Sequence, residues 1–140
     1  MLEENADPDV LAPERAAEPS AGSRSLEISN ALARLHKHYV GRGPANARTT
    51  IDGDLVVCLL EGGYTRAEQT LEENDMGNIV ATGRLGLQDA MRQAMIEAVE
   101  GILGRRVRSF MSANDLRQNF QFEAFVLRRE DAEPDSDLLD

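Results

Sequence analysis

The sequence has one cysteine, no tryptophan and only 4% aromatic residues among its 140. A lone Cys58 excludes an intrachain disulfide framework and favours a reducing compartment. The longest apolar run is the six residues from Leu55 to Leu60, far short of the ~20 that span a bilayer. No basic segment followed by an apolar stretch opens the chain, so no secretory signal is visible. We therefore expect a cytoplasmic protein without direct membrane insertion.

Acidic residues outnumber basic ones by 25 to 15, and their excess lies at the two ends. Residues 1–23 hold six acids and one arginine, and residues 130–140 hold six acids and no base. Neither segment has the periodicity or apolar content that would offset chain entropy. We predict disordered acidic tails at 1–23 and 130–140 around one folded domain at 24–129. The tails are interpreted as solubilising, with a partner-binding motif at Leu138-Leu139 as the alternative.

The first predicted helix starts near Ser23 or Ser25, whose side chains suit an N-cap. It ends at Gly41, which suits the left-handed residue after a helix, and Pro44 prevents its resumption. Four residues at helical spacing form one apolar stripe: Ile28, Leu32, Leu35 and Tyr39.

A β-hairpin is predicted next, with strands at 48–52 and 55–61. Asp52-Gly53 is a favoured pair for the two-residue turn between them. The second strand is apolar on both faces, so we expect it in the interior of the sheet and covered on each side.

Thr65 and Glu68 have the spacing of a capping box, which predicts a short helix to about residue 74 with Ala67 and Leu71 inward. A longer helix is expected from about Thr82 to Leu103.

Two more strands follow, at 107–111 and 120–127. Alternation places Phe120, Phe122, Ala124 and Val126 on one face of the last strand, opposite Gln121 and Glu123, which predicts a half-buried strand. The fold class is therefore α+β in the order α-β-β-α-α-β-β, a four-stranded, mostly antiparallel sheet with helices packed on it.

The long predicted helix carries a second apolar stripe, formed by Ile96, Val99 and Leu103. One sheet face does not need both stripes, and an exposed apolar stripe marks an interface. We therefore expect a homo-oligomer, most simply a dimer, with these three residues at the interface. The alternative is that another helix of the same chain covers the stripe.

No catalytic or metal site can be assembled from the sequence, and no cofactor is expected. His36 and His38 point about 200° apart on a helix, so they cannot share one ion, and we interpret both as solvated. Cys58 lies mid-strand among apolar residues, which predicts a structural rather than a nucleophilic thiol. The Arg105, Arg106 and Arg108 cluster lacks interleaved aromatics, so we do not expect nucleic acid as a partner.

The loop from Gly41 to Pro44 is the one segment that suggests a ligand. Exposed amides beside Arg42 and Gly43, with Arg48 a few residues on, are suited to a phosphate or carboxylate. However, the loop follows a helix and precedes a strand, which is the reverse of the phosphate-binding glycine loops. A helix C-cap and turn is the competing interpretation.

Three segments together resemble the bacterial MpsC-like family. These are the run YVGRGPANARTTIDGDLVVCLLEGGYTRAEQTLEEN from Tyr39, the Arg84 to Val107 spacing R-x5-A-x5-I-E-x6-G-x2-V, and FEAFVL near the end. The resemblance covers about residues 25–128. It implies a role beside a sodium-translocating, membrane-potential-generating or bicarbonate transport system, and it supplies no catalytic residue.

We therefore expect a non-enzymatic accessory or regulatory domain, with a membrane transport protein as a possible partner. The alternative is a small-molecule, anion or nucleotide sensor that uses the Gly41–Pro44 loop. An enzyme ranks third.

Overall fold

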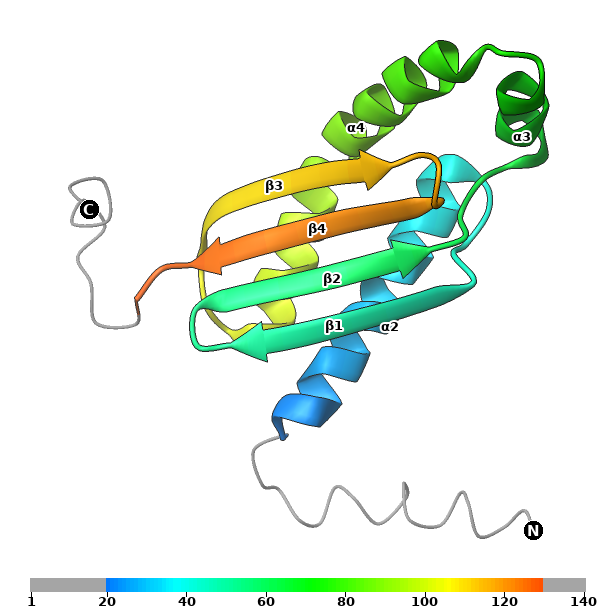
Figure 1. Ribbon diagram of the computed structural model, residues 1–140. Coiled ribbons are helices and arrows are strands. Elements are labelled where there is room, and N and C mark those ends of the chain that lie inside the picture. Colours follow the sequence, from blue (N-terminus) through cyan, green and yellow to red (C-terminus); the bar gives the residue numbers. More distant parts are fainter. Residues whose placement is uncertain (1–19, 130–140) are drawn as a thin grey trace, which may run out of the picture.

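The computed structural model describes residues 20–129. They form three helices and four strands in the predicted order (Figure 1). The elements are α2 (Ala21–Val40), β1 (Asn46–Asp52), β2 (Leu55–Glu61), α3 (Arg66–Glu73), α4 (Gly77–Leu103), β3 (Val107–Asp115) and β4 (Phe120–Leu127). The α+β class predicted from the sequence is confirmed. Residues 1–19 and 130–140, which hold most of the predicted tails, lie outside the described residues.

The sheet has the strand order β1-β2-β4-β3, and every neighbouring pair is antiparallel. Two hairpins, β1–β2 and β3–β4, are joined in the middle by the pairing of β2 with β4. Helices α3 and α4 lie between the hairpins in the sequence and return the chain to the sheet.

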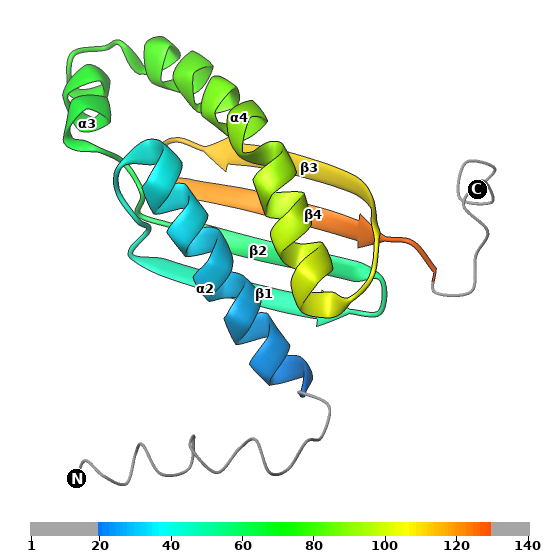
Figure 2. The same ribbon diagram turned by 180° about the vertical axis from the view of Figure 1, so that it is seen from behind.

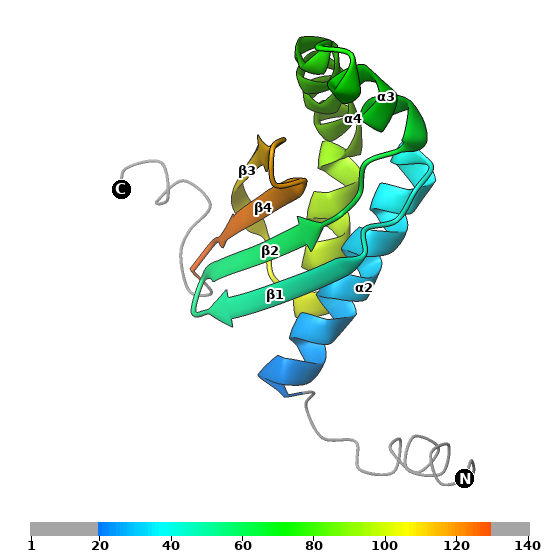
Figure 3. The ribbon, with the colours of Figure 1, turned by 45° about the vertical axis from the view of Figure 1, so that its right-hand side comes forward.

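Both long helices pack on the same face of the sheet, as Figures 2 and 3 show from behind and from the side. We call this the inner face and the opposite one the outer face. None of the described elements covers the outer face. Within residues 20–129, β2 is therefore covered on one side only, where cover on both sides was expected, and it does lie in the interior of the sheet.

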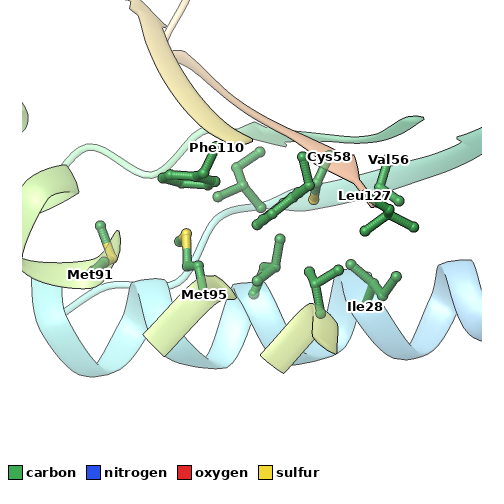
Figure 4. Close-up of a cluster of buried hydrophobic side chains, with 11 residues drawn as sticks. Ile28, Val56, Cys58, Met91, Met95, Phe110 and Leu127 are labelled. Carbon is green, nitrogen blue, oxygen red and sulfur yellow. The ribbon is translucent and has the colours of Figure 1, made fainter. Parts of the chain in front are cut away.

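The hydrophobic core lies between the inner face and the two long helices (Figure 4). Helix α2 contributes Ile28 and Leu32, and every third or fourth residue of α4 faces the same space. The strands supply alternate apolar residues, and Phe110 and Phe125 pack with their ring centroids 4.8 Å apart. The fully buried members from α4 and the strands are Met91, Met95, Val99, Val56, Cys58, Leu60, Phe125 and Leu127.

The helix ends follow local capping rules. Gly41 closes α2 with a φ of 96°, a conformation that favours glycine. Thr65 and Glu68 form the predicted capping box at the start of α3. The N-cap of α2 is Ser20 rather than Ser23 or Ser25, because the Ser20 hydroxyl accepts a hydrogen bond from the Ser23 amide at 3.0 Å.

Several predicted bounds need correction. Asp52 pairs with Leu55 in the ladder, so the two turn residues are Gly53 and Asp54 instead of Asp52 and Gly53. Helix α4 begins at Gly77, five residues before the predicted start, and β3 extends to Asp115. On α3 no residue is fully buried and Ala67 is exposed.

At the start of β4 the buried face is the polar one, whereas the face with the phenylalanines was expected to be buried. Gln121 and Glu123 point to the inner face and are buried, whereas Phe120 and Phe122 lie on the outer face and are 37% and 40% exposed. Alternation predicts two faces, but it does not say which one meets the helices. The reason for this orientation lies in a network of buried polar side chains.

Candidate functional site

The most concentrated polar chemistry in the described chain surrounds Arg84, a residue of α4 that is only 3% exposed. A guanidinium group has five N–H donors, and each one has a partner here. Nε donates to Glu68 at 2.8 Å and Nη2 donates to the other carboxylate oxygen of Glu68 at 2.7 Å. Nη2 also donates to the Gly63 carbonyl at 2.8 Å, and Nη1 donates to His36 and Gln121 at 3.1 Å each.

These partners come from four different parts of the fold. His36 is on α2, Glu68 on α3 and Gln121 on β4, while Gly63 lies in the connection between β2 and α3. Arg84 therefore joins all three helices to the sheet. Breaking any one contact would leave a buried charge or acceptor without its partner, which is costly in a low-dielectric interior.

Glu68 combines two functions in one carboxylate. It completes the capping box by accepting from the Thr65 amide at 2.9 Å, and it forms the bidentate ion pair with Arg84. Burial raises the pKa of Glu68, but hydrogen bonds from Arg84 and Thr65 outweigh burial, so its pKa lies below the usual value. Glu68 is thus held as the carboxylate.

The geometry around His36 fixes its tautomer. Its Nδ1 lies 2.8 Å from the Arg42 carbonyl, which can only accept, so Nδ1 carries the proton. Nε2 then accepts the hydrogen bond from Arg84. Burial lowers the pKa of His36, and the nearby Arg84 charge lowers it further against the opposing effect of the Arg42 carbonyl. His36 is therefore held neutral.

The prediction that His36 is solvated is wrong, since it is 1% exposed. Its ring instead takes the inward position that the apolar stripe assigned to Tyr39, which is 39% exposed. The ring also packs directly on the backbone of the next segment. A Cβ added at Gly63 would lie 2.6 Å from its Cε1 and 3.0 Å from its Nε2.

The network continues from Arg84 across the sheet. Gln121 accepts from Arg84 and donates through Nε2 to Glu123, which also accepts from the Ser112 hydroxyl. Glu123 is 0% exposed. Burial raises its pKa to about 7, although hydrogen bonds from Gln121 and Ser112 oppose this. Glu123 thus titrates near neutral pH inside the core.

Glu123 is one member of a row of polar residues on the inner face. The register pairs Thr49 with Cys58, Cys58 with Glu123, and Glu123 with Ser112, so the row crosses all four strands. Thr49 is hydrogen-bonded to Ser29 of α2 at 2.8 Å. The row explains why the start of β4 turns its polar side inward.

Cys58 is fully buried within this row. Burial raises the pKa of its thiol to about 11, and the neighbouring Glu123 raises it too, against a hydrogen bond with Thr49. A thiol with this pKa is neutral at physiological pH and a poor nucleophile. This agrees with a structural function for Cys58.

Tyr64 covers the solvent side of the cluster. The Arg84 guanidinium lies 5.4 Å from the centre of its ring, and its hydroxyl donates to the Leu116 carbonyl at 2.7 Å. Burial raises the pKa of Tyr64 to about 12. A cavity of about 10 Å³ remains between Arg84 and the β3–β4 turn, room for about one water molecule. It is too small for an organic substrate.

The predicted ligand-binding residues do not gather around this cluster. Arg42 is exposed, and its backbone carbonyl rather than its side chain contacts His36. Gly43 is half-buried against Lys37. Arg48 lies on the outer face of β1 and pairs with Glu61 at 3.5 Å.

The predicted interface stripe lies mostly inside the chain. Val99 is fully buried in the core, and Ile96 and Leu103 are half-buried at its margin. Helix α2 packs beside α4 and covers this side of it, as Figure 2 shows. Val99 therefore offers no surface to a second chain, whereas Ile96 and Leu103 each keep part of their surface exposed.

Two further findings concern residues 20–129 alone. No group of three or more His, Cys, Asp or Glu side chains in this range is placed to hold a metal ion. None of the three helices in this range combines the length and apolar character that a bilayer span requires.

Sequence reasoning did not assign a function to Arg84, the centre of the network. Two signals were present. Arg84 is a charged residue on the same face of α4 as Met91 and Met95, and it opens the spacing pattern that carries the family resemblance. Its partners lie 16 to 48 residues away in the sequence, so no local pattern links them.

Fold and site together define a small α+β domain built around a buried, fully hydrogen-bonded arginine. The chain belongs to the MpsC family, described as Na+-translocating membrane potential-generating system, whose family model matches residues 20–129. The resemblance seen in the sequence is thereby confirmed.

One relative is the uncharacterized protein YbcI of Bacillus subtilis (strain 168). It is 30% identical over 118 residues, which cover 73% of this chain and 95% of the relative. No solved structure matches this chain.

Proposed function

We propose that this protein is a non-enzymatic accessory or regulatory subunit of a Na+-translocating, membrane-potential-generating system, or of a related bicarbonate transport system. In this proposal it acts from the cytoplasmic side, by contact with a membrane protein. The family description supports the first part of this proposal.

One structural observation favours a non-enzymatic role. All five donors of Arg84 are already used by groups of the same chain. A catalytic arginine needs a free donor for its substrate or for the charge that develops in a transition state. A saturated arginine instead fixes the relative positions of the elements it joins.

The proposal is tested by deleting the gene and measuring the sodium-dependent membrane potential with a voltage-sensitive dye. The potential should fall, and re-expression of the chain should restore it. The amount of re-expressed chain that is needed to restore the potential distinguishes an accessory subunit from an enzyme. A stoichiometric subunit restores the potential in proportion to its amount until its partner is saturated, whereas an enzyme restores it at trace levels. An unchanged potential in the deletion strain would contradict the proposal.

The sensor hypothesis for the Gly41–Pro44 loop has one observation in its favour. The hydrogen bond between His36 and the Arg42 carbonyl fixes the loop backbone, so an exposed Arg42 is presented from a rigid support. Thermal shift with phosphate, carboxylates and nucleotides tests it. A stabilisation that is lost in Arg42→Ala but retained in the exposed helix variant Arg34→Ala would favour the sensor.

A further inference from the structure

The outer face of the sheet is apolar along its two central strands. Its β2 column is Leu55, Val57 and Leu59, and its β4 column is Phe120, Phe122, Ala124 and Val126. Leu55, Phe120 and Phe122 are all more than a third exposed, and Met111 on the neighbouring β3 is 54% exposed. Figure 1 looks onto this face, which no described helix covers.

The orientation of β4 makes this exposure unusual. Because side chains alternate along a strand, β4 has one face with Gln121 and Glu123 and another with two phenylalanines. In a sheet with one wet face, the polar set faces water. Here the polar set is inside and the phenylalanines are outside. Removing the phenylalanine side from water as well would therefore be favourable.

The size of the face fits an interaction site. Four strands about 4.8 Å apart and about seven residues long at 3.3 Å each cover roughly 450 Å² in projection, and the two apolar central strands make up about half of this area. Two such faces pack about 10 Å apart in a β-sandwich, with their side chains interdigitated.

We propose that the outer face binds the outer face of a second copy of this chain, through a two-fold axis parallel to the strands. The symmetry of the apolar area supports this occupant. The apolar columns are the two middle strands of the order β1-β2-β4-β3. A two-fold axis along the midline places β2 over β4 of the other copy and β1 over β3. Leu59 then meets Phe122 of the second copy, since the two residues share one row of the register.

The edge strands are complementary in size and charge under the same rotation. Thr50 on β1 shares a row with Met111 on β3, and Arg48 shares one with Ala113. In the dimer, Met111 of one copy therefore faces the smaller Thr50 of the other. In the same way, Arg48 faces the smaller Ala113. Asp115 lies in the row after Ala113, within reach of a long arginine side chain.

Charge argues against the chain's own ends as occupants. Residues 1–23 and 130–140 hold six acids each, and the outer face already carries Asp52, Glu61 and Asp115. An acidic segment would add like charges at this surface. A second copy brings the same three acids, with Glu61 and Asp115 in one row of the register, but it also supplies the apolar centre and an Arg48 that offsets them.

The first test is the mass of the full chain by light scattering from 1 to 100 µM. We expect twice 15.4 kDa at the upper concentrations. Phe122→Arg should reduce the mass to that of one chain with unchanged circular dichroism, because it puts a charge at the centre of a dry interface. The matched control is Leu85→Arg, which changes a 64% exposed residue of α4 and should remain dimeric. If Phe122→Arg does not fold, Met111→Arg provides the same test at a more exposed position.

The second test exchanges the edge charges. Arg48→Asp and Asp115→Arg should each weaken the dimer several-fold, and the double variant should recover most of the wild-type affinity. Three outcomes would overturn the proposal: a wild-type monomer at 100 µM, a dimer that Leu85→Arg disrupts while Phe122→Arg does not, or a double variant weaker than both single ones. A chain that becomes dimeric only after removal of 130–140 would assign the face to that segment instead.

Discussion

Arg84 and Glu68 form two parallel hydrogen bonds, Nε to Oε2 at 2.8 Å and Nη2 to Oε1 at 2.7 Å, between α4 and α3. This fork geometry is specific to arginine and a carboxylate. The pair is nearly inaccessible to water on the arginine side, and the same carboxylate caps α3. Consequently the position of α3, which has no fully buried residue of its own, depends on this ion pair.

Arg84→Met should lower the free energy of unfolding by about 3–5 kcal/mol, since it leaves the Glu68 carboxylate buried beside unpaired acceptors. Urea denaturation with circular dichroism measures this. The exposed Arg66→Met on α3 is the control and should change stability by less than about 0.5 kcal/mol. Combining Arg84→Met with Glu68→Gln should cost less than the sum of the two single changes. Strict additivity would show that the two side chains are not coupled.

Gly63→Ala should destabilise the fold by about 1–3 kcal/mol, because the new methyl group would overlap the buried His36 ring. Gly83→Ala is a matched control on α4, where an added Cβ meets nothing within 4 Å. There alanine should be neutral or stabilising by up to about 1 kcal/mol. The melting temperatures of the two variants, each compared with that of the wild type, test this prediction. Equal melting temperatures would mean that the His36 ring can move away without cost.

His36 should make stability fall as the solution becomes more acidic. Its folded pKa lies below the ordinary value of 6.5, so the unfolded state binds its proton more readily. Stability from His36 is therefore fully present above pH 6.5 and is lost as the pH falls through the folded pKa. Urea midpoints from pH 7.5 to 5 measure this in the Glu123→Gln background, which removes the opposing carboxyl. His36→Gln should flatten the dependence, and the exposed His38→Gln should not.

Glu123 should act in the opposite direction. Its pKa rises from 4.5 to about 7 on folding, so its contribution to stability is fully present below pH 4.5 and is lost as the pH rises through about 7. The free energy of unfolding of Glu123→Gln should therefore increase relative to that of the wild type as the pH rises from 5 to 8, by at most about 3 kcal/mol. Unfolding free energies at several pH values measure the difference. Glu73→Gln, an exposed change on α3, is the control, and a pH-independent difference for Glu123→Gln would contradict the assignment.

Local signals in the sequence predicted the element order and several boundaries correctly. Gly41 and the Thr65–Glu68 capping box act over three or four residues, so their geometry is contained in the sequence. Glu68 has one contact that local sequence signals predict and one that they do not. Its spacing to Thr65 predicted a cap, but its ion pair with Arg84 depends on how two helices meet.

His36 and β4 were misjudged for the same physical reason. A histidine is buried when both of its ring nitrogens have partners. Here one partner is the Arg42 carbonyl nearby in the sequence, and the other is Arg84, 48 residues away. Alternation in β4 separated Gln121 and Glu123 from the two phenylalanines correctly. The inward side was decided by Arg84 and Ser112, which lie on other elements.

The strand order also has a consequence for how the chain folds. Each hairpin closes over a short turn, so β1–β2 and β3–β4 can form through contacts that are local in the sequence. The central pairing of β2 with β4 brings together segments separated by both α3 and α4. Closing so long a loop costs entropy before any contact compensates for it. The slow step of folding should therefore be the pairing of two preformed hairpins. Substitutions in the paired strands β2 and β4 should then change the folding rate more than substitutions in the edge strands β1 and β3.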